Sequence, residues 1–281
     1  MLIIKDFSLR HTIESGQPLA FYSDYTRQHG KEELRYVTQK GIIWFRLSGE
    51  RADYTFEGEY TKSSAGEEIR RRFSIDEDIM HIYKSISTDE FMAKAIKEFH
   101  GLRITCNDPW ETALCFVVSQ FNNIKRIRGI MRNLINEFGP VYDGIHLFPG
   151  PEQIADSSTA RIRACGTGFR DRYIKRLAEE FSSGFDAKRL YRMKYDDAKA
   201  KLMALDGIGD KVADCILLFG YNKLEAFPID VWVKRVMEKA YFNGRKTSMR
   251  QIHDFSAERW GKYRGYAQQY IFWYGREKRM I

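Results

Sequence analysis

Residues 203–235, MALDGIGDKVADCILLFGYNKLEAFPIDVWVKR, decide the fold of this chain. Apolar side chains recur at helical spacing on both sides of the short segment 205–209. They are Ala198, Leu202 and Leu205 before it, and Val212, Ala213, Ile216 and Leu217 after it. Gly207 and Gly209 favour a sharp turn that leaves N–H groups free at the start of the second helix, where a phosphate can bind. The stretch therefore predicts a helix-hairpin-helix at about residues 196–220.

Two ionisable residues near this hairpin point to chemistry. Lys211 lies in the first turn of the second expected helix, where the helix dipole disfavours a cation by roughly 0.3–1 kcal/mol. Asp230 follows in Pro228-Ile229-Asp230-Val231, where we expect it to cap another helix. Taken singly, the hairpin is most often a packing or DNA-binding turn, the lysine a solvated side chain and the aspartate a cap. Their combination at this spacing favours chemistry on DNA.

The charge of the chain agrees with a polyanionic partner. Among 281 residues, 46 Lys and Arg stand against 38 Asp and Glu, which gives a net charge of +8 and a pI near 9.2. The basic residues form three clusters: Lys125, Arg126, Arg128 and Arg132; Arg161, Arg163, Arg170, Arg172, Lys175 and Arg176; and Lys234, Arg235 and Lys239. One such cluster is ordinarily the solvated face of a helix. Their recurrence around the hairpin favours a DNA-binding surface.

The cysteines and the apolar runs bear on the compartment and on cofactors. Cys106, Cys115, Cys165 and Cys215 are too scattered for a zinc site or an iron–sulfur loop, and we expect reduced thiols inside the cell. The apolar start at residues 1–4 is too short for a signal peptide, and no run is long enough to cross a bilayer. These features predict a soluble intracellular protein.

The pattern along the chain predicts a sheet followed by helices. Residues 34–47 alternate around a turn near Lys40-Gly41, and residues 54–60 alternate again. From about residue 75 the pattern is helical, with an apolar helix at 110–120 and an amphipathic one at 124–138. We expect an N-terminal antiparallel sheet domain over residues 1–105 and a helical domain over residues 106–281.

The string Lys211-Val212-Ala213-Asp214-Cys215, followed by Asp230, resembles the helix-hairpin-helix DNA glycosylases. Within them the chain is most similar to the 8-oxoguanine DNA glycosylase family, in its archaeal or bacterial branch with an N-terminal sheet domain. Flanking matches occur in the same order, at Ser15-Gly16-Gln17, Ser119-Gln120-Phe121-Asn122-Asn123, Gly168-Phe169-Arg170 and Trp260-Gly261-Lys262-Tyr263. The resemblance implies an α+β fold, with a sheet lobe followed by a two-lobed helical domain. It also implies a bifunctional glycosylase/AP lyase that excises 8-oxoguanine from duplex DNA in base excision repair.

The resemblance assigns the catalytic residues and the pocket for the flipped base. Lys211 is the expected nucleophile at C1′, which leads to a Schiff base and β-elimination, and Asp230 is expected to stabilise the developing positive sugar. A helix N-terminus and partial burial both favour the neutral amine that this attack needs. The base is expected between Phe272 and Cys215, with its pairing edge on Gln268. The Gly16 carbonyl would accept the proton that N7 carries in 8-oxoguanine and lacks in guanine.

The resemblance also assigns contacts to the rest of the DNA. The opposite cytosine would be read by Arg126 and Arg170, with Phe169 as the wedge in the gap. The family has three consecutive Asn where this chain has Phe121, Asn122 and Asn123, so Phe121 replaces the first of them. We therefore expect a weaker preference for cytosine opposite the lesion. Gly207 and Gly209 are expected to bind phosphate, as is Trp232, which stands where the family has a His.

The remaining expectations concern cofactors, partners and alternatives. We expect no catalytic metal and no iron–sulfur cluster, and the hairpin leaves room for a structural cation. The expected partner is double-stranded DNA containing 8-oxoguanine, bound by a monomer in a prokaryotic cytoplasm or nucleoid. Two other functions stay open: a non-catalytic helix-hairpin-helix DNA-binding protein, and a glycosylase for other damaged or alkylated bases in which Asp230 activates water. Lys211 distinguishes these two functions from the lyase, because neither of them needs Lys211 as a nucleophile.

Overall fold

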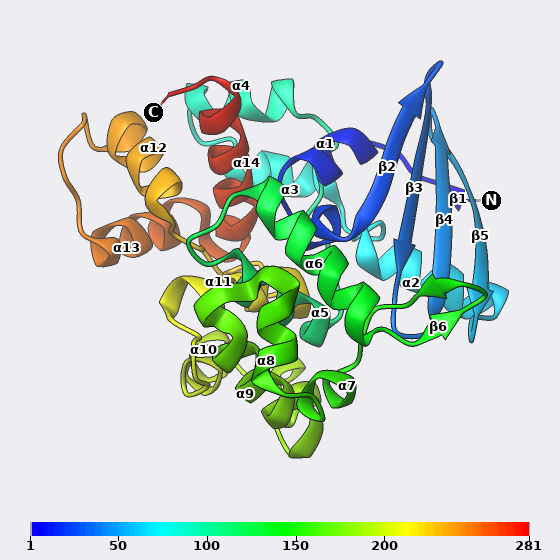
Figure 1. The fold of residues 1–281 in the computed structure, drawn as a ribbon. Coiled ribbons are helices and arrows are strands. Elements are labelled where there is room, and N and C mark those ends of the chain that lie inside the picture. The colour runs from blue at the N-terminus through cyan, green and yellow to red at the C-terminus, as the bar shows by residue number, and fades with distance from the viewer. Residues whose placement is uncertain (1, 281) are drawn as a thin grey trace.

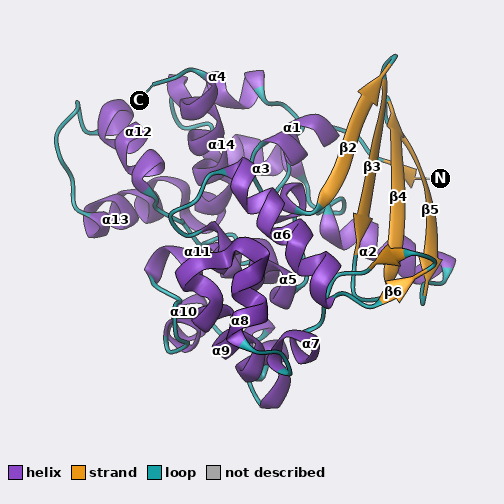
Figure 2. Cartoon of the chain, in the orientation of Figure 1, coloured by secondary structure: helices purple, strands orange, loops and turns teal. Residues whose placement is uncertain are grey.

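The computed structural model describes residues 2–280 and shows a sheet at one side of a larger body of helices (Figures 1 and 2). The ends of the two expected domains, Met1 and Ile281, lie outside the described residues. The sheet has five antiparallel strands in the order β1-β5-β4-β3-β2. Their bounds are β1 (Leu2–Ile3), β2 (Ser23–Gln28), β3 (Lys31–Val37), β4 (Gly41–Ser48) and β5 (Arg51–Gly58). The predicted alternation and the turn near Lys40-Gly41 are confirmed.

One face of the sheet is buried because apolar side chains alternate along its central strands. Leu34 pairs with Phe45 and Tyr36 with Ile43 across β3 and β4, and all four are buried. The Phe45 ring lies 5.1 Å from the ring of Phe73, the residue that ends α2. The sheet is thereby attached to the helical body.

Helices begin earlier than residue 75, which corrects the prediction. The N-terminal helices are α1 (Leu9–Glu14), α2 (Lys62–Arg72), α3 (Ile79–Ile86) and α4 (Glu90–Glu98). In α2 the buried residues include Ala65 and Ile69, but most of its side chains are polar, so its hydrophobic period is weak. A reciprocal capping box between Thr61 and Ser64 defines its start.

The remainder of the chain is mainly helical, as predicted. Its helices are α5 (Pro109–Ser119), α6 (Ile124–Phe138), α7 (Pro151–Ala155), α8 (Thr159–Ile162), α9 (Asp171–Ser183), α10 (Tyr195–Met203), α11 (Asp210–Tyr221), α12 (Val231–Tyr241), α13 (Met249–Trp260) and α14 (Arg264–Glu277). A short hairpin, which the sequence did not predict, joins β6 (Val141–Tyr142) to β7 (Ile145–His146). The helices expected at 110–120 and 124–138 are α5 and α6.

The last helix returns to the helices that precede α5. Figure 1 shows α14 beside α1, α3 and α4, while α5 to α11 form a second group of helices. The Tyr270 hydroxyl on α14 lies 2.8 Å from that of Tyr83 on α3, and the Tyr266 hydroxyl donates to Glu77 at 2.7 Å. The two groups of helices are two lobes, and the candidate site lies where they meet.

Candidate active site

The hairpin between α10 and α11 is built on one glycine that no other residue can replace without strain. Gly207 has a φ of +83°, and a Cβ added there would lie 2.6 Å from the Tyr173 ring. Gly209 begins α11, and no side chain in the described part of the chain caps this end. The first N–H groups of α11 are therefore directed to the exterior, where a phosphate can bind them.

Lys211 lies one turn before Cys215 on α11, with its amine against an aromatic ring. The Lys211 Nζ is 5.1 Å from the centroid of the Phe116 ring, which stacks on Phe219 at 5.5 Å. Cys215 is buried, and burial raises the pKa of its thiol to about 12, although the Lys211 charge opposes this shift. At neutral pH the thiol stays protonated and serves as a small apolar surface.

Asp230 caps α12, as the sequence predicts. Its carboxylate accepts a hydrogen bond from the Val233 N–H at 2.7 Å. One carboxylate oxygen holds the helix end, and the side chain also reaches a cavity that it shares with Lys211. A cap and a catalytic carboxylate are compatible at this position.

The cavity has a volume of about 440 Å³ and lies between the two lobes. This volume falls within the size range of small-molecule binding pockets, which suits a single nucleobase. Nine of the predicted site residues line it: Gly16, Asn122, Asn123, Lys211, Cys215, Asp230, Trp232, Gln268 and Phe272. Segments far apart in the sequence therefore place the proposed nucleophile and the proposed base pocket around one space.

The base-pocket residues are positioned by a buried network around Ser15-Gly16-Gln17. The Gln17 amide donates to the Arg103 carbonyl at 2.8 Å, and its side-chain oxygen accepts from the Thr105 N–H at 2.7 Å. Gln269 donates to the Ser15 carbonyl at 3.0 Å. These bonds hold Gly16, whose φ is +77°, beside the Phe272 ring.

Gln268 presents a polar atom that is ready for a ligand. The side chain is 6% exposed, and its Oε1 has no hydrogen-bond partner within residues 2–280. A buried carbonyl without a donor costs free energy, and a ligand that supplies an N–H removes that cost. A nucleobase edge offers such a donor.

The Asn residues of the predicted opposite-base group have structural roles as well. Asn122 donates to the Val118 carbonyl at 3.1 Å, and Asn123 caps α6 by accepting from the Arg126 N–H at 3.0 Å. Arg126 is exposed at the start of that helix. Trp232 is about half exposed at the start of α12 and lines the cavity.

Arg170, which is expected to read the opposite base, is buried in this structure. Its guanidinium donates to the carbonyls of Gln120, Phe121 and Thr167, and the residue is 3% exposed. The donors that were predicted to read the opposite base are therefore engaged by backbone groups. Phe169 next to it is 54% exposed, in keeping with a wedge.

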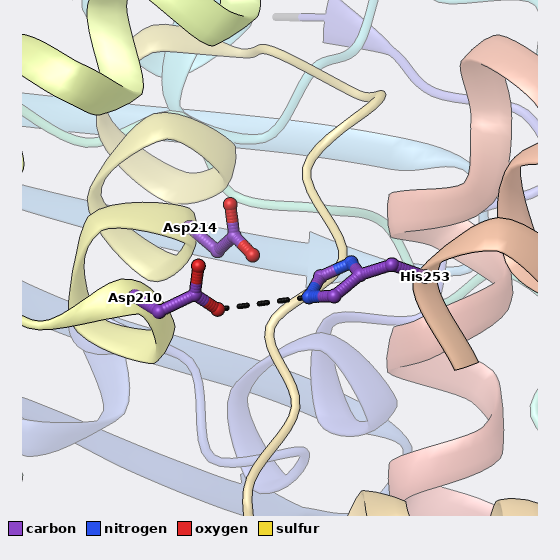
Figure 3. Close-up of side chains that lie close together, drawn as sticks. All are labelled: Asp210, Asp214 and His253. Carbon is purple, nitrogen blue, oxygen red and sulfur yellow. Dashed lines mark ion pairs between the residues drawn. The ribbon is translucent and has the colours of Figure 1, made fainter. Parts of the chain in front are cut away.

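Near the start of α11, Asp210 and Asp214 form a cluster with His253 whose ligand atoms are close enough to consider as a metal site. Ligand atoms of Asp210, Asp214 and His253 lie within 4.8 Å of one another (Figure 3). The Lys199 ammonium lies 2.8 Å from Asp210 and 3.0 Å from Asp214, so the chain itself supplies a cation to both carboxylates. Burial lowers the pKa of His253, which keeps its ring neutral at neutral pH. Because the Lys199 ammonium already pairs with both carboxylates, these residues do not fit an additional metal ion.

At the hairpin turn, where the sequence leaves room for a structural cation, two backbone carbonyl groups accept hydrogen bonds. The Gly207 carbonyl accepts from the Gln120 amide at 2.8 Å, and the Leu205 carbonyl accepts from the Ile208 N–H at 3.1 Å. Carbonyl groups are natural ligands for a hard cation, and each of these two keeps a second lone pair.

The residues at and around the site that the sequence analysis missed include Phe116, Lys199 and Gln269. Phe116 sits in an apolar run that predicts only core, yet its ring faces Lys211. Lys199 gives no signal because both of its carboxylate partners lie on another helix. Gln269 positions the Ser15-Gly16 segment from α14, and its adjacency to Gln268 was the one available hint.

Comparison with known proteins identifies the class. Residues 114–262 match a family model described as the HhH-GPD superfamily of base excision DNA repair proteins, and residues 2–113 match the N-terminal domain of 8-oxoguanine DNA glycosylase. The fold and the lysine-containing hairpin define a helix-hairpin-helix base excision repair protein. The chain belongs to the 8-oxoguanine DNA glycosylase family, as the sequence predicts.

Individual relatives agree with this assignment. A probable N-glycosylase/DNA lyase of Methanothermobacter thermautotrophicus is 31% identical over 242 residues, which is 76% of each chain. The N-glycosylase/DNA lyase of Saccharomyces cerevisiae is 28% identical over 73% of this chain and 65% of its own. The Clostridium acetobutylicum 8-oxoguanine glycosylase/lyase, solved with DNA containing cytosine opposite the lesion, is 27% identical with a TM-score of 0.86. That match covers 97% of this chain and 93% of the other.

Proposed function

We propose that this protein is a bifunctional DNA glycosylase/AP lyase that excises 8-oxoguanine from duplex DNA. The observation that carries the proposal is the position of Lys211 in the first turn of the hairpin helix α11. Lys211 lines the same cavity as Asp230. A phosphate on the hairpin and a base in the cavity place a nucleotide across this amine. Family relatives named N-glycosylase/DNA lyase support the same chemistry.

The reaction begins when the damaged nucleotide leaves the base stack and its base enters the cavity. The Lys211 nitrogen forms a bond to C1′ as the C1′–N9 bond breaks, and the base departs with the bonding electron pair. The departing base takes up the proton that the attacking amine loses. The C1′–O4′ bond then breaks, O4′ takes up a proton from solvent, and a protonated Schiff base forms between Lys211 and C1′. Loss of a C2′ proton expels the 3′-phosphate, so the strand is cut.

Asp230 supports the first step through its charge. Positive charge develops on the sugar as the glycosidic bond breaks, and a nearby carboxylate stabilises it. An Asp230→Asn variant retains a side chain that caps helices well, so the fold is kept. We expect its excision rate to fall about 100-fold or more, in the range found when one electrostatic group is removed from an active site.

Recognition of the base uses the cavity walls. Phe272 and Cys215 provide apolar surfaces for the two faces of the ring, and the unpartnered Gln268 carbonyl accepts a hydrogen bond from its pairing edge. The Gly16 carbonyl accepts the N7 proton of 8-oxoguanine. Guanine has a lone pair at N7 instead of a proton. 8-oxoguanine therefore forms a hydrogen bond with the Gly16 carbonyl, whereas guanine would place one acceptor against another.

The proposal includes a monomer that needs no cofactor, because an amine and a carboxylate supply every group that this reaction requires. Double-stranded DNA as the partner is supported by the net charge of +8 and by the DNA complex of the Clostridium relative. We propose the cytoplasm or nucleoid as the compartment, since the substrate is there. Among the described helices, none has the length and apolar character to cross a membrane.

A cleavage assay tests the proposal. Duplexes with one central 8-oxoguanine, one 3-methyladenine or one normal guanine are incubated with the protein, and products are resolved before and after alkali. We expect excision and strand cleavage on the 8-oxoguanine duplex and none on the guanine duplex. Exclusive activity on the methylated base, or binding without excision of either base, would contradict the proposal.

A further inference from the structure

Phe121 combines two features that are unfavourable for a bulky apolar residue. Its side chain is 91% exposed, and its φ of +49° lies in the left-handed region. Bulky residues rarely adopt this conformation, whereas Asn and Gly do so readily. Such an outlier at the rim of a functional cavity points to a role in binding.

The segment that carries Phe121 is held firmly in place. The Gln120 amide donates to the Gly207 carbonyl of the hairpin at 2.8 Å, and Asn122 donates to the Val118 carbonyl at 3.1 Å. Asn123 caps α6. Because the neighbours on both sides are fixed by hydrogen bonds, the exposed position of the Phe121 ring is a property of the fold.

Arg170 contacts the segments that carry two exposed rings, Phe121 and Phe169. Its guanidinium donates to the carbonyls of Gln120 and Phe121, and its Cζ lies 4.4 Å from the centroid of the Phe169 ring. The rings of Phe121 and Phe169, which we call the aromatic pair, lie 6.3 Å apart and are tilted by 58°. Phe169 also contacts Tyr173 edge-on at 6.5 Å, and Tyr173 covers Gly207 of the hairpin.

The chemistry of the ligand follows from these groups. Two adjacent exposed rings offer π faces to a partner, and bases stack on aromatic rings regardless of their hydrogen-bonding pattern. The aromatic pair stands next to Asn122 and Asn123, which line the base cavity, and beside the exposed Arg126. A base stack with phosphates on either side fits this combination of rings and positive charge.

We propose that the aromatic pair enters the DNA as a unit, with Phe169 in the gap left by the flipped nucleotide and Phe121 in the stacking position of the opposite base. Arg170 is then a positioning residue for both rings and does not read that base. This inference rests on the proposed function and deepens it. The substrate class therefore includes 8-oxoguanine opposite any base, and 8-oxoguanine opposite an abasic site.

The test compares two duplexes that differ only across from the lesion. One has cytosine opposite 8-oxoguanine, and the other has a tetrahydrofuran abasic analogue there. Single-turnover excision and equilibrium affinity are both measured, the latter by fluorescence anisotropy with the Lys211→Gln protein as background. We expect the two wild-type excision rates to agree within about threefold, because the Phe121 ring replaces the missing base in the stack.

Variants separate the stacking role from a fold defect. Phe121→Gly removes the ring and suits the backbone conformation, so the fold is kept. We expect it to lose about tenfold in affinity and rate on both duplexes, since stacking corresponds to roughly 5- to 150-fold per base. Phe121→Tyr should retain both values. Tyr142→Ala, which removes an exposed ring from the distant β6 hairpin, is the matched control and should behave as wild type.

Arg170→Gln distinguishes a positioning residue from a reader of cytosine. A positioning role predicts equal losses on the two duplexes, whereas a base reader loses only on the duplex that contains cytosine. Wild-type excision at least about 100-fold slower opposite the abasic analogue, or unchanged affinity in Phe121→Gly, would overturn the inference. No excision on either duplex contradicts the proposed function instead, and the affinity of Phe121→Gly still decides the role of the ring.

Discussion

The Lys211 amine lies 5.1 Å from the centre of the Phe116 ring, on the face that a cation prefers. The ring comes from α5 and is stacked on Phe219 of α11, so it cannot follow the lysine if the latter moves. The contact restricts the amine to one side of the cavity before the sugar arrives.

This relationship predicts that Phe116→Leu slows adduct formation while the fold is maintained. Leucine keeps an apolar side chain but removes the flat face beside which the amine lies, so the amine loses its fixed position relative to C1′. We expect a loss of about tenfold, since a misplacement of about 1 Å can cost about 100-fold. Single-turnover kinetics with the 8-oxoguanine duplex measure the effect, and thermal unfolding monitors packing. A wild-type rate in a folded Phe116→Leu protein would show that the ring does not position the amine.

The two hairpin glycines should respond differently to alanine. Gly207→Ala places a methyl group 2.6 Å from the Tyr173 ring and forces an L residue to a φ of +83°. We expect a loss of about 2 kcal/mol or more in the free energy of unfolding, together with weaker DNA binding. Gly209→Ala is the matched control, because nothing lies within 4 Å of its added Cβ and its φ is −90°. Equal stability of the two variants by denaturant titration would contradict this account.

Adjacent glutamines on α14 provide another matched pair. Gln268→Ala removes a carbonyl that has no partner in the described structure, so stability should hardly change, while lesion excision should fall about tenfold or more. Gln269→Ala breaks the bond to the Ser15 carbonyl and should lower the free energy of unfolding by about 1 kcal/mol. Parallel excision and denaturation measurements check both. If Gln268→Ala loses excision of 8-oxoguanine only in proportion to its affinity for undamaged DNA, Gln268 does not read the base.

A buried ion network predicts part of the pH dependence of stability. Arg72 is 1% exposed and lies 2.5 Å from Glu68 and 2.9 Å from Glu111. Burial alone would raise the pKa of Glu68, but Arg72 and Arg71 outweigh it and hold that pKa at about 2. The carboxylate therefore contributes stability above about pH 4.5, and this contribution is lost as the pH falls toward 2.

The Glu68→Gln variant isolates that contribution. It should be less stable than the wild type at pH 7 by about 3 kcal/mol, since one pKa unit corresponds to about 1.4 kcal/mol. The difference should shrink between pH 4.5 and pH 2, where wild-type Glu68 becomes protonated. Denaturant titrations across this range measure it. A difference that does not depend on pH would mean that Glu68 acts through packing and not through its charge.

Much of the fold could be predicted because its signals are local. The alternation of residues 34–47, the apolar period of 124–138 and the Gly207 turn each depend on neighbours in the sequence. The polar helix α2 lacked such a period, and its start depends on a capping box that uses Ser64 in place of an acidic residue. The β6–β7 hairpin has two residues in each strand, which is too short for alternation to show.

The site was less accessible to sequence reasoning, because its geometry depends on distant segments. The resemblance to the family motif was enough to suggest Lys211, Asp230 and Gln268. The direction of the Phe116 ring could not be predicted, because α5 is buried along nearly its whole length. The sequence likewise assigned Arg170 to the DNA. Two of the three carbonyl groups that engage it come from a loop about fifty residues earlier, and only the folded chain brings them together.

The central claim is that Lys211 forms a covalent bond with the sugar, and borohydride trapping tests it most directly. The wild-type and Lys211→Gln proteins are incubated with a duplex containing one 8-oxoguanine opposite cytosine, and borohydride is added to reduce any Schiff base. We predict a stable protein–DNA adduct for the wild type. We predict neither adduct nor excision for Lys211→Gln, although it still binds the lesion. Excision at the wild-type rate by Lys211→Gln, or an adduct attached to another residue, would contradict the account.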